Sequence, residues 1–329
     1  MDETTVIDLT EPPPVPERRK RRPFRFLFKL LVVLLVVVLA GLYWGLAQIP
    51  HVEPDPDLAA GFVDQTFLLI GSDSRADLPD DLAGSFGDFG GERSDVVILA
   101  HPTGGTLQLL SLPRDLKVSI EGHGTNKINA AYAFGGAALL AQTTSKATGI
   151  PINHVVEIDF AGFADLVDAL GGIDIAFPNA ARDTKSGLEV AAGTTRIDGA
   201  TALAFSRSRS YQENINGSWV SVDADDIGRT SRQQKALEAM LHRIASVEGL
   251  ARSPLFFGKL STATRVDSGL NPLDVFTTAY GMWRADVDGA TVPVRFSNEG
   301  GVSYVVFDGD KADEVIARFR RGEPLTPAE

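Results

Sequence analysis

Arginines are concentrated in short polar segments at the ends of apolar runs, the positions from which α/β proteins bind ligands. These arginines are Arg75, Arg93, Arg114, Arg207, Arg209 and Arg229. A guanidinium group donates two parallel hydrogen bonds, which makes it the side chain best suited to phosphate. For any single arginine a surface salt bridge is the more common role. Together, the positions predict a site that binds a phosphate-bearing ligand.

Two aspartates stand beside these arginines. Asp73 lies in the segment 71–75, and Asp95 follows Arg93 by two residues. Their carboxylates can offset the repulsion among the arginines or hold a hard cation. Mg²⁺ typically binds one or two carboxylates together with phosphate oxygens. The set resembles a metal-assisted pyrophosphate site with Asp73 and Asp95 as candidate ligands of the cation, although turn chemistry alone also accounts for Asp73.

The spacing within the last arginine segments indicates which side chains act together. Arg207 and Arg209 are two residues apart, so they point the same way in extended backbone. Arg229 and Gln233 are four residues apart and share one face of a helix. Asp226 leads into that helix, whose N-terminal end carries a partial positive charge. These residues are predicted to face the same ligand.

Apolar runs and helical periodicity predict the elements that position these residues. Strands are expected at 66–70, 95–100, 107–112, 155–158, 173–177, 291–295 and 303–307, and helices at 130–148, 160–170, 199–205, 230–244 and 312–320. The core side of the long helix is expected to carry Leu237, Met240, Leu241 and Ile244. Strands alternating with helices predict a single α/β/α layered sandwich with a central mixed sheet, preceded by one transmembrane helix.

The transmembrane helix is predicted at residues 30–47, which contain no charged residue. Eighteen residues of helix span about 27 Å, close to the thickness of a bilayer core. A buried core helix would show a polar stripe, and a cleaved signal peptide a small-residue cleavage site; neither is present. Seven basic residues lie just before the span, so the disordered tail 1–29 is expected in the cytoplasm. An extracytoplasmic linker, 48–62, would then lead to the exported domain.

Composition excludes several other kinds of site. The chain of 329 residues has no cysteine, which rules out disulfides, iron–sulfur clusters and thiol nucleophiles. The net charge is −12, and since residues 1–29 carry +2, the rest carries −14. A domain this acidic repels the phosphate backbone of nucleic acids, so no nucleic-acid partner is expected.

Six ordered segments resemble one known family. They read LLIGSDSR, ERSDVVIL, LSLPRDL, KINAAYAFGG, ALAFSRSR and DIGRTSRQQ, and they follow a single N-terminal anchor. In this order they closely resemble the LytR-CpsA-Psr family over residues 63–245, which would form the catalytic domain. Residues 246–329 carry no interpretable motif and are expected to complete that domain.

The resemblance implies a glycopolymer phosphotransferase of the cell membrane. Family members transfer a glycan from a polyprenyl-pyrophosphate carrier to peptidoglycan as a phosphodiester, with magnesium assisting. Carried over by position, the catalytic residues are Asp73, Asp95, Arg207 and Arg209, and the pyrophosphate-binding residues are Arg75, Arg93, Arg114, Lys127, Asn129, Asp226, Arg229 and Gln233. Phe160, Phe163 and the apolar remainder of KINAAYAFGG would line a lipid cleft.

Two features leave alternatives open. The insert 210–225 is longer than expected for the family, makes the alignment near Asp226 less certain, and is a candidate acceptor-side lid. The same residues also suit a hydrolase that cleaves the pyrophosphate with water, or a scaffold that binds wall lipid without catalysis. The identity of the glycan is not indicated by the residues.

Overall fold

The computed structural model describes residues 51–52, 65–72, 94–223, 226–267, 269 and 285–325. The predicted tail 1–29 and span 30–47, and most of the linker 48–62, lie outside the described residues. Among the helices that are described, none is long and apolar enough to cross a membrane. The membrane span therefore stays a prediction.

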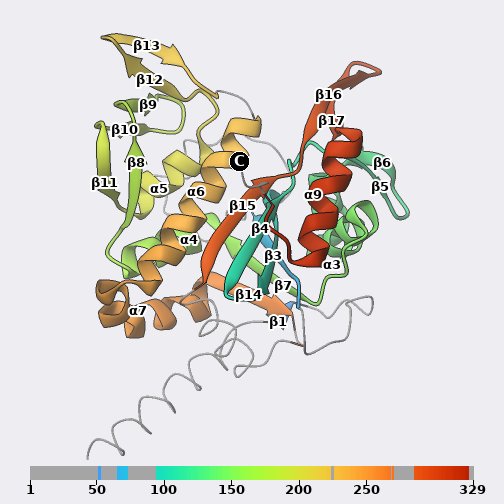
Figure 1. The fold of residues 1–329 in the computed structure, drawn as a ribbon, viewed down its shortest axis with the longest axis horizontal. Coiled ribbons are helices and arrows are strands. Elements are labelled where there is room, and N and C mark those ends of the chain that lie inside the picture. Colours follow the sequence, from blue (N-terminus) through green and yellow to red (C-terminus); the bar gives the residue numbers. More distant parts are fainter. Residues whose placement is uncertain are drawn as a thin grey trace, which may run out of the picture. The chain divides into compact units, whose positions relative to one another are not determined.

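A seven-stranded mixed sheet forms the centre of the domain, in the order β1-β14-β7-β2-β3-β4-β15 (Figure 1). The strands are β1 (His51–Val52), β14 (Thr264–Asp267), β7 (His154–Asp159), β2 (Phe67–Ser72), β3 (Ser94–Thr103), β4 (Thr106–Ser111) and β15 (Asp286–Thr291). The neighbour pairs β2–β7, β4–β15 and β1–β14 are parallel, and the other three are antiparallel. The predicted central mixed sheet is confirmed.

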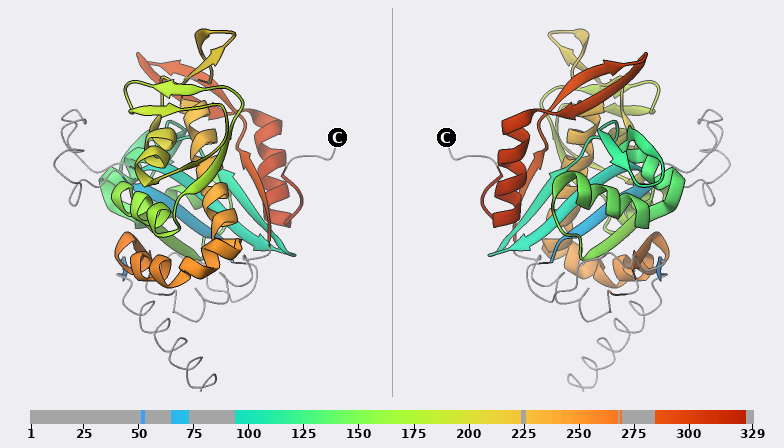
Figure 2. Two further views of the ribbon diagram at one scale, coloured as in Figure 1. Left: turned by 90° about the vertical axis from the view of Figure 1, so that its left-hand side faces the viewer. Right: turned by 90° about the vertical axis from the view of Figure 1, so that its right-hand side faces the viewer.

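Helices cover both faces of this sheet (Figure 2). One face packs on α3 (Ile128–Thr148) and α9 (Gly309–Arg321), and the other faces α4 (Phe160–Ala169), α5 (Gly199–Arg207) and α6 (Asp226–Ala245), with α7 (Val247–Ala263) against α4. Alternation along β2 assigns the faces: Leu68 and Ile70 join the cluster under α3, while Leu69 packs in the cluster that includes Leu237 of α6. The predicted α/β/α layering is confirmed.

Helix α6 is buried on two sides, as its predicted core residues require. Met240 packs on β8 (Ile173–Phe177) and β11 (Gly193–Ile197), whereas Leu241 packs toward the central sheet. Leu237 contacts both clusters and Ile244 packs on the first. A helix between two sheets holds its polar N-terminal turn in a fixed place.

Smaller sheets occupy the ends of the domain. A four-stranded sheet contains β10 (Leu188–Val190), β9 (Ala181–Asp183), β12 (Gln212–Ile215) and β13 (Ser218–Ser221), in that order. Two hairpins form separate two-stranded sheets: β5 (Lys117–Ile120) pairs with β6 (Gly124–Lys127), and β16 (Val294–Glu299) pairs with β17 (Val302–Phe307). The insert 210–225 thus contributes two strands to a sheet. Asn216 and Gly217 turn the hairpin with φ of 53° and 82°, as a two-residue turn of this type requires.

Several expected elements have different bounds in the structure; the long helix predicted at 230–244, for example, spans Asp226–Ala245. Residues 291–295 are not one strand: β15 ends at Thr291 and β16 begins at Val294, because Pro293 has no N–H to continue a ladder. The helix predicted at 199–205 extends to Arg207. The spacing suggested that Arg207 and Arg209 lie together on extended backbone, but Arg207 is the last residue of the helix.

Candidate functional site

A β-bulge places Asp95 at the edge of the central sheet. The pairing of β2 with β3 shifts between Gly71, opposite Val96, and Ser72, opposite Ser94, so Asp95 is the extra residue. Such a bulge re-aims a side chain out of the regular ladder. Gly71 is needed here, because a Cβ atom would lie 2.6 Å from Cγ2 of Val96.

Asp95 gathers groups from three parts of the fold. Nη1 of Arg114, which follows β4, donates to Asp95 Oδ1 at 2.7 Å. Nη1 of Arg229, on the first turn of α6, lies 3.8 Å from the same oxygen, and Nε2 of Gln233 donates to the Asp95 carbonyl oxygen at 3.4 Å. The predicted pairing of Arg229 and Gln233 on one helical face is confirmed. These four predicted site residues are brought together.

Charge keeps the Asp95 carboxylate ionised. Burial raises its pKa, but the guanidinium groups of Arg229, Arg114 and Arg209 outweigh burial, so the pKa lies below its ordinary value. Arg229 is 2% exposed, so its charge is poorly screened by water. Several cations therefore share Asp95, and Nε of Arg114 also lies 3.9 Å from Oδ1 of Asp115. Guanidinium groups gathered in this way suit a ligand with anionic oxygens.

Lys127 and Asn129 support the turn that carries Arg114. Nζ of Lys127 lies 3.0 Å from Oδ1 of Asp115, the residue after Arg114. The backbone N–H of Asn129 donates to the Arg114 carbonyl at 3.2 Å, and the Asn129 side chain is buried. Both predicted residues thus contact the turn that carries Arg114.

The segment after α5 is held by a buried carboxylate that sequence reasoning missed. Oδ2 of Asp183 accepts from the Ser208 hydroxyl at 2.6 Å and from the backbone N–H groups of Arg209 at 3.0 Å and Ser210 at 2.8 Å. Asp183 is 1% exposed. No linear motif marks this residue, because its partners lie 25 to 27 positions away.

Arg232 holds the same segment from the other side. Its Nη2 donates to the Ser208 carbonyl at 2.7 Å and its Nη1 to the Asp223 carbonyl at 3.1 Å. Its guanidinium group lies 4.8 Å from the centroid of the Tyr211 ring. Arg232 lies three residues after Arg229 on the same helix, and this spacing could have indicated that both side chains face the same region. Arg207 and Arg209 thus extend from a doubly anchored segment.

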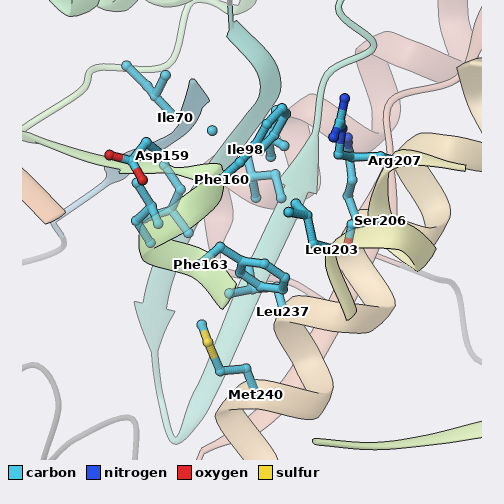
Figure 3. Close-up of a pocket in the computed structure, with 15 residues that line it drawn as sticks. Ile70, Ile98, Asp159, Phe160, Phe163, Leu203, Ser206, Arg207, Leu237 and Met240 are labelled. Carbon is cyan, nitrogen blue, oxygen red and sulfur yellow. The ribbon is translucent and has the colours of Figure 1, made fainter. Parts of the chain in front are cut away.

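An apolar pocket opens beside Arg207 (Figure 3). Leu69, Val96 and Ile98 of the sheet form one wall, and Phe160, Phe163, Leu203, Leu237 and Met240 of the helices form the other. Asp159, Ser206, Arg207 and Gln233 also line it. The Arg207 guanidinium lies 4.9 Å from the centroid of the Phe160 ring. The site therefore joins a cationic cluster to an apolar cavity.

Phe160 and Phe163 line the pocket as predicted, whereas the KINAAYAFGG helix does not. Its residues Ile128, Ala131 and Tyr132 pack in the cluster on the opposite face of the central sheet. The expectation that its apolar residues line the same cleft is wrong for this pocket, because they are needed to cover that face.

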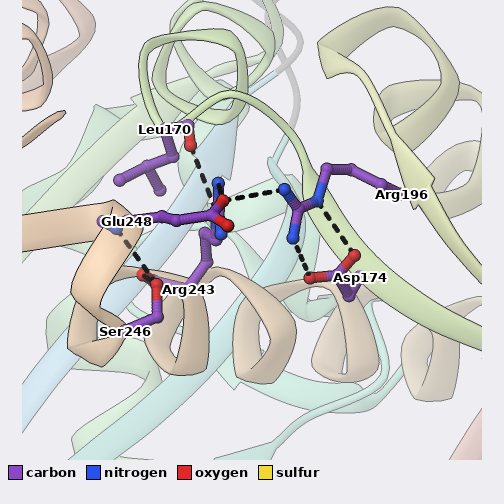
Figure 4. Close-up of polar contacts among 7 residues, drawn as sticks. Leu170, Asp174, Arg196, Arg243, Ser246 and Glu248 are labelled. Atoms are coloured by element: carbon purple, nitrogen blue, oxygen red, sulfur yellow. Dashed lines mark hydrogen bonds and ion pairs between the residues drawn. The ribbon is translucent and has the colours of Figure 1, made fainter. Parts of the chain in front are cut away.

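The C-terminal end of α6 is fixed by an ion-pair network (Figure 4). Nε of the buried Arg243 donates to the Leu170 carbonyl at 3.1 Å, and its Nη2 lies 2.6 Å from Oε2 of Glu248. Glu248 also accepts from Arg196, which binds Asp174 through two nitrogens. These contacts tie α6 to α7 and to the β8–β11 sheet, so the direction in which Arg229 points is set from both ends of the helix.

Several predicted site residues cannot be placed. Asp73, Arg75 and Arg93 lie outside the described residues, and Asp226 is described only as the first residue of α6. Among the described residues, no group of three or more His, Asp or Glu side chains could hold a metal ion. Asp95 fits the role of one carboxylate ligand to a cation that also binds phosphate oxygens.

The chain is similar to known cell-wall proteins. A model described as the LytR_cpsA_psr family matches residues 60–321. A probable cell wall biosynthesis protein LcpB of Corynebacterium glutamicum is 34% identical over 300 residues, covering 88% of this chain and 70% of the relative. A polyisoprenyl-teichoic acid–peptidoglycan teichoic acid transferase TagU of Enterococcus faecalis is 30% identical over 274 residues, covering 79% and 84%. The chain spans about half the length, 54%, of the TagU of Bacillus mycoides.

Solved structures share the fold. A LytR-Csp2A-Psr enzyme from Actinomyces oris superposes with a TM-score of 0.64 at 24% identity, covering 82% of this chain and 95% of the other. YwtF (TagT), with bound octaprenyl pyrophosphate lipid, superposes with a TM-score of 0.58 at 22% identity, covering 83% and 97%.

Proposed function

Because the chain belongs to the LytR-CpsA-Psr family, we propose that it is a phosphotransferase that moves a glycopolymer from a polyprenyl-pyrophosphate carrier onto peptidoglycan. Named relatives are transferases of teichoic acid to peptidoglycan. The activity, the donor and the acceptor are carried over from such relatives as parts of the proposal.

One observation carries the proposal: the arginine cluster around Asp95 adjoins the apolar pocket, with Arg207 and Gln233 at the junction. A polyprenyl pyrophosphate has the same division, since a diphosphate is joined directly to a hydrocarbon chain. Arginine forks bind the phosphate oxygens, and burial of the chain against Phe160 and Phe163 is favoured by the hydrophobic effect. A water-soluble phosphate ester has no hydrocarbon chain to bury against the apolar wall.

The reaction is a substitution at phosphorus. The acceptor hydroxyl oxygen forms a bond to the phosphorus that bears the glycan, the bond from that phosphorus to the bridging oxygen breaks, and polyprenyl phosphate leaves. Arginines stabilise the charge that develops on the phosphate oxygens. Arg114, Arg207, Arg209 and Arg229, with Arg75 and Arg93, are assigned this role.

Asp95 is assigned the proton of the attacking hydroxyl. Its pKa, lowered by the surrounding arginines, makes it a weak base before a ligand binds. A bound diphosphate offsets their charge, raises the pKa of Asp95 and makes it a better proton acceptor when the donor is in place. Before that, Asp95 holds Arg114 and Arg229 in position.

Mg²⁺ is proposed as the cofactor, held by Asp95 and Asp73 together with the diphosphate. It would supply additional neutralisation of the phosphate charge. Residues 30–47 are proposed as a single-pass membrane anchor with a cytoplasmic N-terminus, which would keep the domain outside the cell and near a membrane-bound donor.

The test is transfer by the full-length protein. Wild type is incubated in detergent with a lipid-pyrophosphate glycan, Mg²⁺ and peptidoglycan, and the covalent product and polyprenyl phosphate are measured. Arg207→Ala is expected to lower transfer by about 100-fold, whereas Arg320→Ala, an exposed arginine on α9, should leave it unchanged. Release of lipid phosphate at the same rate without acceptor would indicate a hydrolase, and normal wall attachment in cells carrying Arg207→Ala would indicate a scaffold.

A further inference from the structure

The four-stranded sheet exposes one polar face with a single aromatic ring. Register places Glu189, Arg182 and Gln212 in one row across β10, β9 and β12, and Asn214 opposite Trp219 across β12 and β13. Side chains on one strand alternate between faces, so Gln212 and Asn214 point the same way. We call the surface formed by these five residues the outer face. It lies at one end of the domain in Figure 1.

The aromatic ring is held in a preset position. Nε of Arg182 donates to Oε1 of Gln212 at 3.0 Å, and the same guanidinium group lies 4.1 Å from the centroid of the Trp219 ring. A cation stacked on an indole ring gains electrostatic energy and restricts the motion of both groups. Even so, Trp219 stays 36% exposed. An exposed large aromatic side chain that the protein has ordered is typical of a binding surface.

The other face of the same strand is tied to the arginine segment. Asp183, next to Arg182 on β9, points inward and binds the Ser208 hydroxyl and the N–H groups of Arg209 and Ser210. Trp219 is two strands away from β9, which is about 10 Å at the usual strand spacing. The sheet that carries the outer face is therefore tied, through its opposite face, to the segment that carries Arg207 and Arg209.

We propose that the outer face binds the glycan strand of the peptidoglycan acceptor. The chemistry fits a polyhydroxylated chain: the Trp219 ring stacks on the apolar face of a sugar ring, while the amides of Asn214 and Gln212 and the Arg182 guanidinium hydrogen-bond with hydroxyl and acetamido groups. The identity of this glycan as the acceptor rests on the proposed function.

Charge favours the acceptor over the donor polymer. The charges of Arg182 and Glu189 balance, so the outer face has no excess of either sign. A glycan strand whose lactyl carboxyl groups carry peptides is uncharged along its backbone, whereas a polymer of phosphodiesters would need additional cations. The same balance argues against an anionic membrane surface, which attracts clusters of lysine and arginine.

Binding is tested with the full-length protein and one probe, a soluble, uncrosslinked peptidoglycan glycan strand that retains its stem peptides, so that its lactyl carboxyl groups stay amidated. Calorimetric titration should show that Trp219→Ala weakens binding by about tenfold or more, as loss of a central aromatic contact does. Trp219→Phe keeps a stacking ring and should retain most of the affinity. Arg182→Ala should weaken binding less, because the ring stays but is no longer held.

The matched control is Val220→Ala. Val220 is the next residue on β13, is 44% exposed, and points to the opposite face. It should bind the strand like wild type. The thermal midpoints of all variants should match that of wild type. If Trp219→Ala unfolds at a lower temperature, its affinity is set aside, and the test becomes whether Trp219→Phe binds the glycan more tightly than Arg182→Ala. Equal affinity of wild type, Trp219→Ala and Arg182→Ala for the strand would overturn the proposal.

A second measurement separates this proposal from the proposed function. In the transfer assay, Trp219→Ala should raise the KM for peptidoglycan and leave binding of octaprenyl pyrophosphate unchanged. If binding of the glycan depends on Trp219 but wild type shows no transfer, the outer face is a glycan site and the proposed transferase activity is refuted. Transfer that is unaffected by Trp219→Ala would leave the transferase intact and refute the outer face.

Discussion

At the scale of residues, the site consists of charges that are set in place before a ligand arrives. Asp95 contacts Arg114 and Arg229 directly, and Asp183 and Arg232 fix the segment that carries Arg207 and Arg209. Holding cations near one another costs energy in an otherwise apolar surrounding, and the buried carboxylates offset that cost. A pyrophosphate binds an arrangement that needs little reordering, which favours both affinity and rate.

Replacing Asp95 with asparagine should separate catalysis from binding. The amide keeps the shape of the side chain but cannot take a proton, and it leaves the nearby arginines with more uncompensated charge. We expect kcat to fall by about 100-fold or more, with a much smaller change in the KM for the lipid donor. Steady-state kinetics measures both; an unchanged kcat would refute the assignment of Asp95 as proton acceptor. Asp165→Asn, an exposed carboxylate paired with Lys259, is the control.

Replacing Asp183 with asparagine should loosen the arginine segment. Oδ2 accepts three hydrogen bonds there, and Oδ1 accepts a fourth from the backbone N–H of Lys185 at 2.9 Å. The NH2 group of an asparagine would therefore face a donor in either orientation of the amide. The expected loss is about 1–3 kcal/mol of the free energy of unfolding, together with a raised KM for the donor. Urea unfolding and donor titrations measure these effects. A variant as stable and as tight-binding as wild type would contradict the positioning role.

The effect of Asp183 on stability should depend on pH in a defined direction. Burial raises its pKa, but the Ser208 hydroxyl and the N–H groups of Ser210 and Lys185 outweigh burial, so the pKa lies below its ordinary value. A lowered folded-state pKa gives stability that is present above the unfolded value of about 3.9 and is lost below it. The stability difference between wild type and Asp183→Asn should be constant from about pH 8 to 5 and shrink below about pH 4.

At the scale of elements, close backbone contact determines how α4, α5 and α6 surround the pocket. Gly199 begins α5 against Ala164 of α4, where a Cβ atom would lie 2.2 Å from the Ala164 carbonyl oxygen. Gly162 of α4 lies equally close to α7, since a Cβ atom added to it would be 2.5 Å from the carbonyl oxygen of Ala263. Small residues at these positions let the helices approach closely enough for Phe160, Leu203 and Leu237 to share one cavity.

Gly199→Ala should therefore destabilise the protein. The added methyl group has no space unless α5 moves away from α4, and overpacking of this kind typically costs about 1–3 kcal/mol. Gly258→Ala on α7 is the control, since nothing lies within 4 Å of its added methyl group and alanine favours a helix by up to about 1 kcal/mol. Thermal unfolding should show opposite shifts for the two variants. Equal shifts would mean that the α4–α5 contact is not tight.

At the scale of the whole molecule, residues after 245 add strands on both sides of the central sheet. β14 joins one side, between β1 and β7, and β15 joins the other, beside β4. Residues after 245 thus take part in the central sheet, and the family match extends to residue 321. Truncation near residue 245 would remove the edge strand β15 and also β14, which pairs with β1.

The proposed anchor makes a prediction for the full chain. Full-length protein should sediment with membranes after alkaline washing, and a chain lacking residues 1–47 should be released, because the uncharged span is the segment able to remain in a bilayer. A protease added to intact cells should reach the domain but not the tail. Release of the full-length protein by alkaline washing, or protection of the domain, would contradict the predicted topology.

Part of this site was predictable from local order in the sequence. The segments with Asp95, Arg114, Arg229 and Gln233 were identified because strand ends in an α/β fold meet at one edge, and because residues four apart share a helical face. The predictions for Asp73, Arg75 and Arg93 stay untested, since these residues lie outside the described part of the chain. Arg207 and Arg209 were expected on extended backbone, but α5 continues through Arg207 since nothing ends the helix at Phe205.

The amino-acid order alone determined the layered class, most central strands, the long helix and the sign of the charge at the site, because periodicity and composition are local properties. Tertiary structure decided that the pocket lies on one face of the sheet and that α3 covers the other. It also decided that Asp183 and Arg232 anchor the segment carrying Arg207 and Arg209. It also turned the insert into an ordered hairpin with Trp219 on an exposed surface. These features depend on contacts between residues far apart in sequence, and such pairings leave no repeat or spacing for a linear pattern to reveal.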